Sequence, residues 1–310
     1  MNRRYAPVLL LLAAPAAAQQ QSAPFVVEQT GEGFATLDEA VGAIRDGEGT
    51  ILIAPGVYRQ CTVQQGGRIT FRAVEPGTAI FEATPCEDKA MLVLRGRGSV
   101  VDGLVFRNVR VADGNGAGIR TEMGDLTVTN ATFVDMQEGI LGGQPTNQRI
   151  TIDRSTFTRL GQCDESESCA HAIYLANQGS VTVTRSRFEQ GRGGHYVKVR
   201  SPRVTITGSS FDDSKGRKTN YAIDLPEGAT GLIAGNAFVQ GPAKENGSTI
   251  IAVAAEAKTY PSTGLRIENN DARLAPGAES RPAFVGDWSG DRLAIGTNRL
   301  GAGITPYARR

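Results

Sequence analysis

The segment "VTVTRSRFEQG" (181–191) combines alternating apolar residues, a short polar stretch and a phenylalanine, and this pattern recurs along the chain. Its copies are "LTVTNATFVDM" (126–136), "ITIDRSTFTRL" (150–160), "VTITGSSFDDS" (204–214) and "LIAGNAFVQG" (232–241). The phenylalanines are Phe133, Phe157, Phe188, Phe211 and Phe238, at steps of 24, 31, 23 and 27 residues. Alternation with period two predicts strands. A unit this short cannot bury its own apolar face, so the copies are expected to stack as a solenoid.

Val and Ile occupy the apolar positions of the repeat, which favours strands of a parallel sheet buried inside the solenoid. Leucine-rich repeats need leucine at fixed offsets, and propeller blades need a longer unit. Weaker copies, at 100–109 with Phe106 and at 264–274 without an aromatic residue, extend the pattern in both directions. The step of 31 contains "CDESESC" (163–169), seven residues that are predicted to be an insertion into a regular unit.

The segment "FATLDEAVGAIRDGEGTILIAPGVYRQ" (34–60) combines apolar residues at helical spacing with a following strand that ends in "PGVY". It resembles the start of secreted proteins of the pectate-lyase-like superfamily. The resemblance implies an all-β, single-stranded, right-handed parallel β-helix within residues 34–310. In that arrangement 34–47 form a helical cap, about 50–275 form the coils and the remainder is a closing segment. It leaves the activity open among lyases, hydrolases, epimerases and binding or adhesive proteins.

The N-terminus has the features of a secretory signal sequence. Arg3 and Arg4 precede the apolar run "APVLLLLAAPAAA", and an Ala-x-Ala site predicts a cut after Ala18. The run is too short to span a membrane comfortably, and no other span is predicted. Residues 19–33 are expected to be a flexible leader, and the mature protein is expected in the periplasm or outside the cell.

Export permits disulfide bonds. Cys163 and Cys169 bracket a short acidic segment, which predicts a local disulfide, and Cys61 and Cys86 then pair with each other. Zinc is the alternative, but the sequence has no C-x-x-C spacing and both histidines lie elsewhere, so no metal site is predicted. Asp212 and Asp213 form an acidic pair that leaves calcium as a weak possibility, although a turn is favoured because no further oxygen ligand is evident.

The net charge of +1 over 310 residues argues against a nucleic-acid-binding protein. Residues 185–218, however, contain nine Lys or Arg and three Asp or Glu, a local net charge of +6. A basic surface on an exported solenoid favours an acidic polysaccharide as partner. We expect a monomer.

A second series of predicted strands alternates with the phenylalanine series. Its members are "AGIRTE" (117–122), "EGILGG" (138–143), "HAIYLA" (171–176), "HYVKVR" (195–200) and "YAIDLP" (221–226). Alternation predicts an outward row that consists of Arg120, Leu141, Tyr174, Lys198 and Asp224. Neighbouring rows on the same strands contain Arg200 and Tyr196. His171 and His195, the chain's two histidines, begin consecutive strands in line with Glu138 and Tyr221 and are predicted to stack.

Acids and bases gathered on one sheet face favour proton-transfer chemistry. We predict β-elimination or epimerisation of a uronate, with His171, Tyr174, His195 and Lys198 as catalytic residues. Lys198 or Arg200 would neutralise the carboxylate, His195 or Lys198 would be the base and Tyr174 the acid. Asp224, Arg120, Arg200 and Tyr196 are predicted to contact or orient the substrate, the tyrosine by stacking on a sugar ring.

Three alternatives stay open. A carbohydrate-binding protein without turnover would need only the charged and aromatic groups of this face. A structural β-helix of the cell envelope would need only its basic surface. A hydrolase would need two carboxyl groups across the scissile bond, whereas Glu122, Glu138 and Asp224 are predicted to lie on several different coils.

Overall fold

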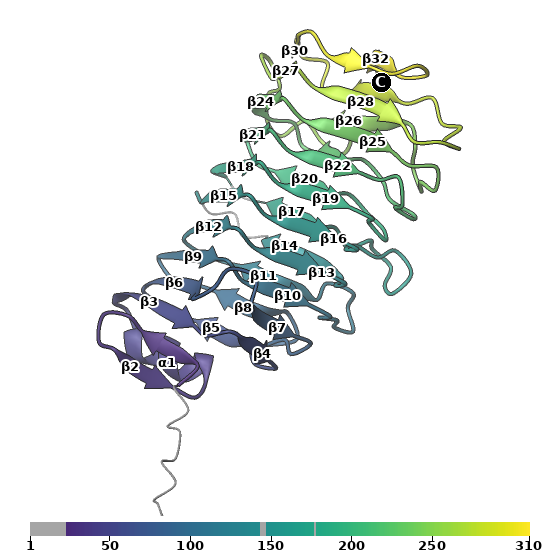
Figure 1. The fold of residues 1–310 in the computed structure, drawn as a ribbon. Helices are drawn as coiled ribbons and strands as arrows, with labels where there is room; N and C mark the ends of the chain where they lie inside the picture. Colours follow the sequence, from purple (N-terminus) through teal and green to yellow (C-terminus); the bar gives the residue numbers. More distant parts are fainter. Residues whose placement is uncertain (1–22, 143–146, 177) are drawn as a thin grey trace, which may run out of the picture.

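The computed structural model describes residues 23–142, 147–176 and 178–310 as an elongated stack of coils, with the helix at one end and the C-terminus at the other (Figure 1). Each coil contributes one strand to each of three sheets, here called sheets A, B and C. Apart from the antiparallel pairs β1–β2 and β1–β3 at the N-terminal end, strands of one sheet pair in parallel with the equivalent strand of the next coil. The chain is therefore a parallel β-solenoid, as the repeat predicts.

Within the described residues, sheet A has twelve strands: β2 (Glu32–Phe34), β1 (Phe25–Val27), β3 (Glu48–Ile53), β6 (Arg68–Ala73), β9 (Gly98–Asp102), β12 (Asp125–Thr129), β15 (Arg149–Asp153), β18 (Ser180–Thr184), β21 (Arg203–Thr207), β24 (Thr230–Ala234), β27 (Arg266–Glu268) and β30 (Ala294–Ile295). Sheet B has ten in the same part of the chain: β4 (Gly56–Tyr58), β7 (Ala79–Glu82), β10 (Val105–Arg107), β13 (Thr132–Val134), β16 (Thr156–Thr158), β19 (Arg187–Glu189), β22 (Ser210–Asp212), β25 (Ala237–Gln240), β28 (Asp271–Leu274) and β31 (Arg299–Leu300). Sheet C also has ten there: β5 (Thr62–Gln64), β8 (Ala90–Leu94), β11 (Ala117–Thr121), β14 (Glu138–Gly142), β17 (Ile173–Ala176), β20 (Val197–Arg200), β23 (Ile223–Leu225), β26 (Thr249–Val253), β29 (Ala283–Asp287) and β32 (Thr305–Arg309).

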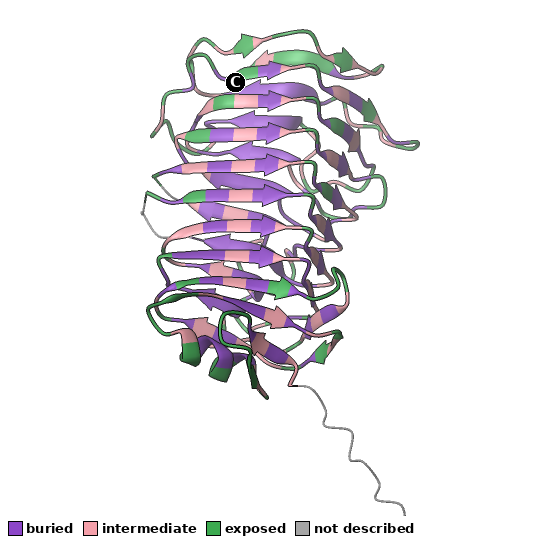
Figure 2. Ribbon diagram, turned by 60° about the vertical axis from the view of Figure 1, so that its left-hand side comes forward, coloured by how far each residue is buried: buried purple, intermediate pink, exposed green. Residues whose placement is uncertain are grey.

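The repeated phenylalanines form a ladder inside the solenoid, on sheet B. Phe133, Phe157 and Phe188 are in register on β13, β16 and β19, with neighbouring ring centroids 4.8 Å apart. The ladder continues in both directions, and where the last copy lacks an aromatic residue Ala272 lies beside Phe238. In Figure 2 buried positions, in purple, alternate with less buried ones along the strands. Stacked rings and aliphatic side chains thus supply most of the buried apolar surface that stabilises the fold.

Helix α1 (Leu37–Ile44) forms where the N-terminal segment predicts it. Thr36 and Glu39 form a capping box at its start, and Leu37, Ala40 and Val41 are buried on one face. The helix contacts β1 and β5 of the first coil. Its role as a cap for the solenoid stays a prediction.

Two domain boundaries differ from the predictions. Parts of the expected flexible leader, residues 19–33, lie in β1 and β2, which pair antiparallel with each other, and β1 also pairs antiparallel with β3 at the first edge of sheet A. The expected closing segment continues the coils, since β29 and β32 extend sheet C in parallel. The predicted signal sequence, residues 1–18, lies outside the described residues.

The turns between strands differ in length, and the irregular ones flank sheet C. Sheet A passes to sheet B through two residues in most coils, for example between β12 and β13. The turns before and after sheet C vary from coil to coil, from the two residues between β20 and β21 to the fourteen between β16 and β17. The disulfide loop Cys163–Cys169 is one of them and leaves the coil between the bridged residues Gln162 and Ala170. Side chains on the outer face of sheet C are therefore flanked by irregular turns on both sides.

Candidate functional site

The predicted outward row on sheet C is confirmed by the strand register. Arg120, Leu141 and Tyr174 are partners on β11, β14 and β17, and Tyr174 continues to Lys198 and Asp224 on β20 and β23. Their sequence neighbours, such as Val197 and Ile223, belong to the core. Outward does not mean exposed here, because Lys198 is only 8% exposed and Asp224 2%.

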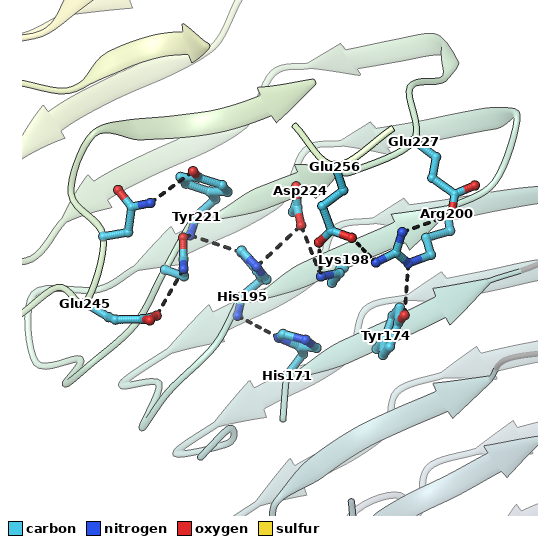
Figure 3. Close-up of polar contacts among 12 residues, drawn as sticks. His171, Tyr174, His195, Lys198, Arg200, Tyr221, Asp224, Glu227, Glu245 and Glu256 are labelled. Carbon is cyan, nitrogen blue, oxygen red and sulfur yellow. Dashed lines mark hydrogen bonds and ion pairs between the residues drawn. The ribbon is translucent and has the colours of Figure 1, made fainter. Parts of the chain in front are cut away.

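Figure 3 shows Lys198 at the centre of a cluster of charged groups. Its Nζ lies 2.7 Å from Oε1 of Glu256 and 3.7 Å from Oδ2 of Asp224. The same Asp224 oxygen lies 3.4 Å from Nε2 of His195. The Lys198 ammonium also lies 5.5 Å from the centre of the Tyr174 ring. One cation thus contacts two carboxyl groups and an aromatic face.

Arg200 forms the other end of the cluster. Its Nε donates to the Tyr174 hydroxyl at 2.9 Å, and Nη1 donates to Glu227 at 2.9 Å. Nη2 pairs with the second carboxylate oxygen of Glu256. Lys198 and Arg200 therefore hold one carboxylate between them, one oxygen each.

The two carboxyl groups that contact Lys198 have opposite pKa shifts. Burial raises the pKa of Asp224 to about 7, against the lowering effect of Lys198. Burial also acts to raise the pKa of Glu256, but hydrogen bonds from Lys198 and Arg200 outweigh it and the pKa is lowered. At neutral pH Glu256 is ionised while Asp224 is close to its midpoint. Groups with such opposed shifts are typical of proton-transfer sites.

The histidines stack, as the sequence predicts, with ring centroids 4.9 Å apart. His171 lies edge-on to Tyr174 at 5.3 Å, and His195 lies 5.2 Å from Tyr221. Burial lowers the pKa of His171 to about 3 and also lowers that of His195 well below its usual value. Both imidazoles are therefore neutral at physiological pH.

Two predicted substrate-contacting residues lie apart from the cluster. The placement of Tyr196 on the surface is wrong: it is 3% exposed, and its hydroxyl donates to Asp213 at 2.7 Å beneath the coil surface. The strand begins only at Val197, so Tyr196 belongs to a turn where alternation does not hold. Arg120 lies on β11, two strands from Tyr174, with its Nε 3.8 Å from Glu122.

The structure also brings in residues that the sequence argument missed. Glu227 and Glu256 come from the turns that follow β23 and β26. Those turns carry no repeat pattern, so nothing in the sequence placed them near Lys198. Glu138, in line with the histidines, is not among the predicted site residues. It is buried, accepts the His171 N–H at 3.3 Å, and has its pKa raised by burial.

The basic surface predicted from residues 185–218 is largely neutralised by carboxylates from outside that window. Arg185 pairs with Asp153, Arg192 with Asp135, and Lys218 with Asp164. At the site, Lys198 and Arg200 face Asp224, Glu227 and Glu256. The cations are thus held in fixed positions by acids rather than exposed as a broad positive face.

Both predicted disulfides are confirmed, Cys61–Cys86 and Cys163–Cys169. Of the described residues, one group of three potential metal ligands comes together, Cys163, Cys169 and Glu245, and its cysteines are oxidised to a disulfide. The calcium candidate Asp213 is buried and already faces Lys244 at 3.2 Å. That the protein holds no metal stays a prediction.

Fold and site together define a parallel β-solenoid with a partly covered polar cluster on one outer sheet face. The family profile described as "Right handed beta helix region" matches residues 90–274, more than half of the chain. The protein belongs to this right-handed β-helix family.

Two solved structures can be compared with this chain. YbhC from Escherichia coli is 14% identical with a TM-score of 0.54, over 96% of this chain and 88% of that one. PfbA, a surface protein and adhesin from Streptococcus pneumoniae, is 11% identical with a TM-score of 0.43, over 87% and 94%. No curated protein matches the sequence. At this identity the likeness to YbhC concerns the fold alone. No helix among the described residues is long and apolar enough to cross a membrane.

Proposed function

We propose that the outer face of sheet C is the active site of an exported enzyme that acts on a uronate-containing polysaccharide by lyase or epimerase chemistry. The observation that carries this proposal is the pair formed by Lys198 and Arg200, which together hold the carboxylate of Glu256. Two fixed cations that take one oxygen each make a binding place for a single carboxylate. A uronate carboxylate is expected to bind there in place of Glu256.

This place suits the first step that lyases and epimerases share. Removal of the proton on the carbon next to the carboxylate sends negative charge into the carboxylate, where fixed cations stabilise it. Arg200 is suited to this role because its other nitrogens are anchored by Tyr174 and Glu227. Arg200 therefore does not have to be ordered when the substrate binds.

Tyr174 is the proposed acid for a leaving glycosidic oxygen. Its hydroxyl accepts a hydrogen bond from Arg200, which leaves the hydroxyl proton free to point elsewhere. Its ring is half-buried beside the apolar Leu141 cluster and beneath the Lys198 ammonium. The Tyr174 hydroxyl and the Glu256 carboxylate thus contact nitrogens of the same Arg200 guanidinium group.

The test is the ultraviolet absorbance of unsaturated uronates. The mature protein is incubated with a panel of uronate-containing polysaccharides, together with Tyr174→Phe and, as a matched control, Tyr307→Phe at the C-terminal end of the solenoid. We expect absorbance to rise with the wild type and the control but not with Tyr174→Phe.

A flat wild-type trace with deuterium entering the sugar from heavy water would support the epimerase form of the proposal. If the polysaccharides bind without absorbance change or exchange, the alternative holds, a carbohydrate-binding protein without turnover. Failure to bind any uronate polymer would contradict the proposal altogether.

A further inference from the structure

Backbone N–H groups fix how the two histidines can carry protons. Three side chains at the beginning of the sheet C segment, in three successive coils, each accept a hydrogen bond from a backbone N–H of the following coil. Glu138 accepts from His171, His171 Nδ1 accepts from the His195 N–H at 3.0 Å, and His195 Nδ1 accepts from the Tyr221 N–H at 3.2 Å. A ring nitrogen that accepts a hydrogen bond is unprotonated, so in a neutral imidazole the other nitrogen carries the hydrogen.

Neither histidine is therefore suited to act as a base. Both are buried and neutral, with Nδ1 occupied by a backbone donor and Nε2 protonated. Nε2 of His195 lies 3.4 Å from Oδ2 of Asp224 and can only donate to it. The function of His195 in this arrangement is to hold the Asp224 carboxyl group.

Asp224 has one carboxyl oxygen that accepts hydrogen bonds from neighbours in the described part of the chain and one that does not. Its Oδ2 faces His195 and Lys198. Its Oδ1 is buried and, among the described residues, has no hydrogen-bond partner. A buried polar atom without a hydrogen-bond partner costs free energy. Burial of this kind disfavours the ionised carboxylate, so proton uptake by Oδ1 is favoured.

We propose that Asp224, through Oδ1, is the base that takes the proton from the carbon next to the substrate carboxylate, and that His195 is a positioning residue. This inference rests on the proposed function of the site. The C–H electron pair passes into the carboxylate as an enolate. In a lyase it then forms the carbon–carbon double bond, the glycosidic C–O bond breaks, and the leaving oxygen takes the Tyr174 proton. In an epimerase the enolate takes a proton from Tyr174 on its other face.

The location of Asp224 agrees with this step. The Glu256 and Asp224 oxygens contact the same Lys198 nitrogen, at 2.7 and 3.7 Å. A substrate carboxylate in the place of Glu256 would therefore contact the same Lys198 nitrogen as Asp224. Asp224 is 2% exposed in the absence of substrate, whereas the Glu256 side chain is 45% exposed and can swing into solvent.

The charges around Asp224 allow it to change protonation near neutral pH. Lys198 and Arg200 on β20 favour its ionised form, while Glu256 after β26 and burial itself favour the protonated form. The balance places the pKa of Asp224 at about 7. His195, which is neutral, adds a donor to the ionised form rather than a charge.

The first experiment observes protonation directly, without an assay. Nuclear magnetic resonance is used to titrate the Asp224 carboxyl carbon, assigned by comparison with Asp224→Asn, and to record the imidazole nitrogens of the wild type. We expect a carboxyl midpoint near 7 and two neutral, Nε2-protonated rings down to about pH 5. A midpoint near 4, or a ring protonated at Nδ1, would overturn the inference.

Substitutions at His195 separate positioning from mere packing. His195→Gln keeps a donor for Asp224 and should leave the carboxyl midpoint and the pH–rate profile close to those of the wild type. His195→Leu removes the donor, which should move both to higher pH. Equal profiles for the two variants would exclude the positioning role, and their melting temperatures show whether both are folded.

Activity completes the test with oligogalacturonate and oligoguluronate as probes. Asp224→Asn should lower elimination or solvent-deuterium exchange by about 100-fold or more while binding is kept. If an active wild type retains its rate in Asp224→Asn, the inference fails and the proposed function survives. If the wild type neither eliminates nor exchanges, both fail.

Discussion

Nζ of Lys198 lies 2.7 Å from Oε1 of Glu256, a residue 58 positions later in the chain and two strands away across sheet C. The ion pair joins a regular strand to an irregular turn. It places a carboxylate of the protein itself where we propose that the substrate carboxylate binds. Removing that carboxylate is the most direct way to test the site.

Glu256→Gln should bind uronate oligosaccharides about tenfold more tightly, which corresponds to about 1.4 kcal/mol. The neutral amide competes less well with an incoming carboxylate for Lys198 and Arg200. Affinity can be measured by isothermal titration calorimetry, with the exposed Glu279→Gln as control. Unchanged or weaker binding would contradict a carboxylate place at this position.

Lys198→Met should destabilise the fold in a pH-dependent way. At pH 8 Asp224 is mostly ionised in the wild type; without Lys198 its pKa rises further, so the buried carboxyl group must either take up a proton or stay charged without this cation, a loss of up to about 3 kcal/mol. At pH 5 Asp224 is protonated, so the loss should be much smaller. Urea denaturation at both pH values measures this, and the exposed Lys215→Met should change stability by no more than about 0.5 kcal/mol. Equal losses at both pH values would mean that Asp224 is not the group left unpaired.

His171 should make the fold sensitive to acid. Its pKa is about 3 in the folded protein, against 6.5 ordinarily, so the unfolded chain binds more protons between these values. The stability contributed by the neutral ring is complete above pH 6.5 and is lost as the pH falls toward 3. His171→Asn keeps an acceptor for the His195 N–H but does not titrate. Its melting temperature should therefore fall less than that of the wild type between pH 7.5 and 4.5.

The comparison of the wild type with His171→Asn also removes the contribution of Asp224. Asp224 titrates in the opposite sense over about pH 4 to 7, because its pKa is raised on folding and its stabilisation is lost as the pH rises. This contribution is common to the wild type and His171→Asn, so it cancels in the difference. An equal fall in both proteins would show that His171 is already solvated or protonated.

Phe157→Ala should cost about 4 kcal/mol, because the ring is fully enclosed and stacks at 4.8 Å on both Phe133 and Phe188. Urea denaturation checks this, with Val57→Ala, at a side chain 54% exposed, as the control. A loss below about 1.5 kcal/mol would mean that the ladder contributes little to the stability of the central coils.

The solenoid was predictable because its determinants are local and repeated. Phe133, Phe157 and Phe188 occupy equivalent positions of successive copies, and parallel stacking at one strand spacing puts equivalent residues side by side. The same rule placed Tyr174 beside Lys198 and Asp224. It failed for Tyr196, which lies in a turn and points inward to Asp213.

By itself, the sequence determined the stacking of coils, the sheet face that carries the polar residues and the pairing of the four cysteines, because each depends on period or spacing along the chain. The tertiary structure decided which charges are paired and which atoms can exchange protons. Glu256 contacts Lys198 from a turn whose length does not follow the repeat. The Tyr221 N–H donates to Nδ1 of His195 and so leaves the ring proton on Nε2. Pairing and protonation depend on distances of a few ångströms and on burial, and neither quantity is encoded in a repeat.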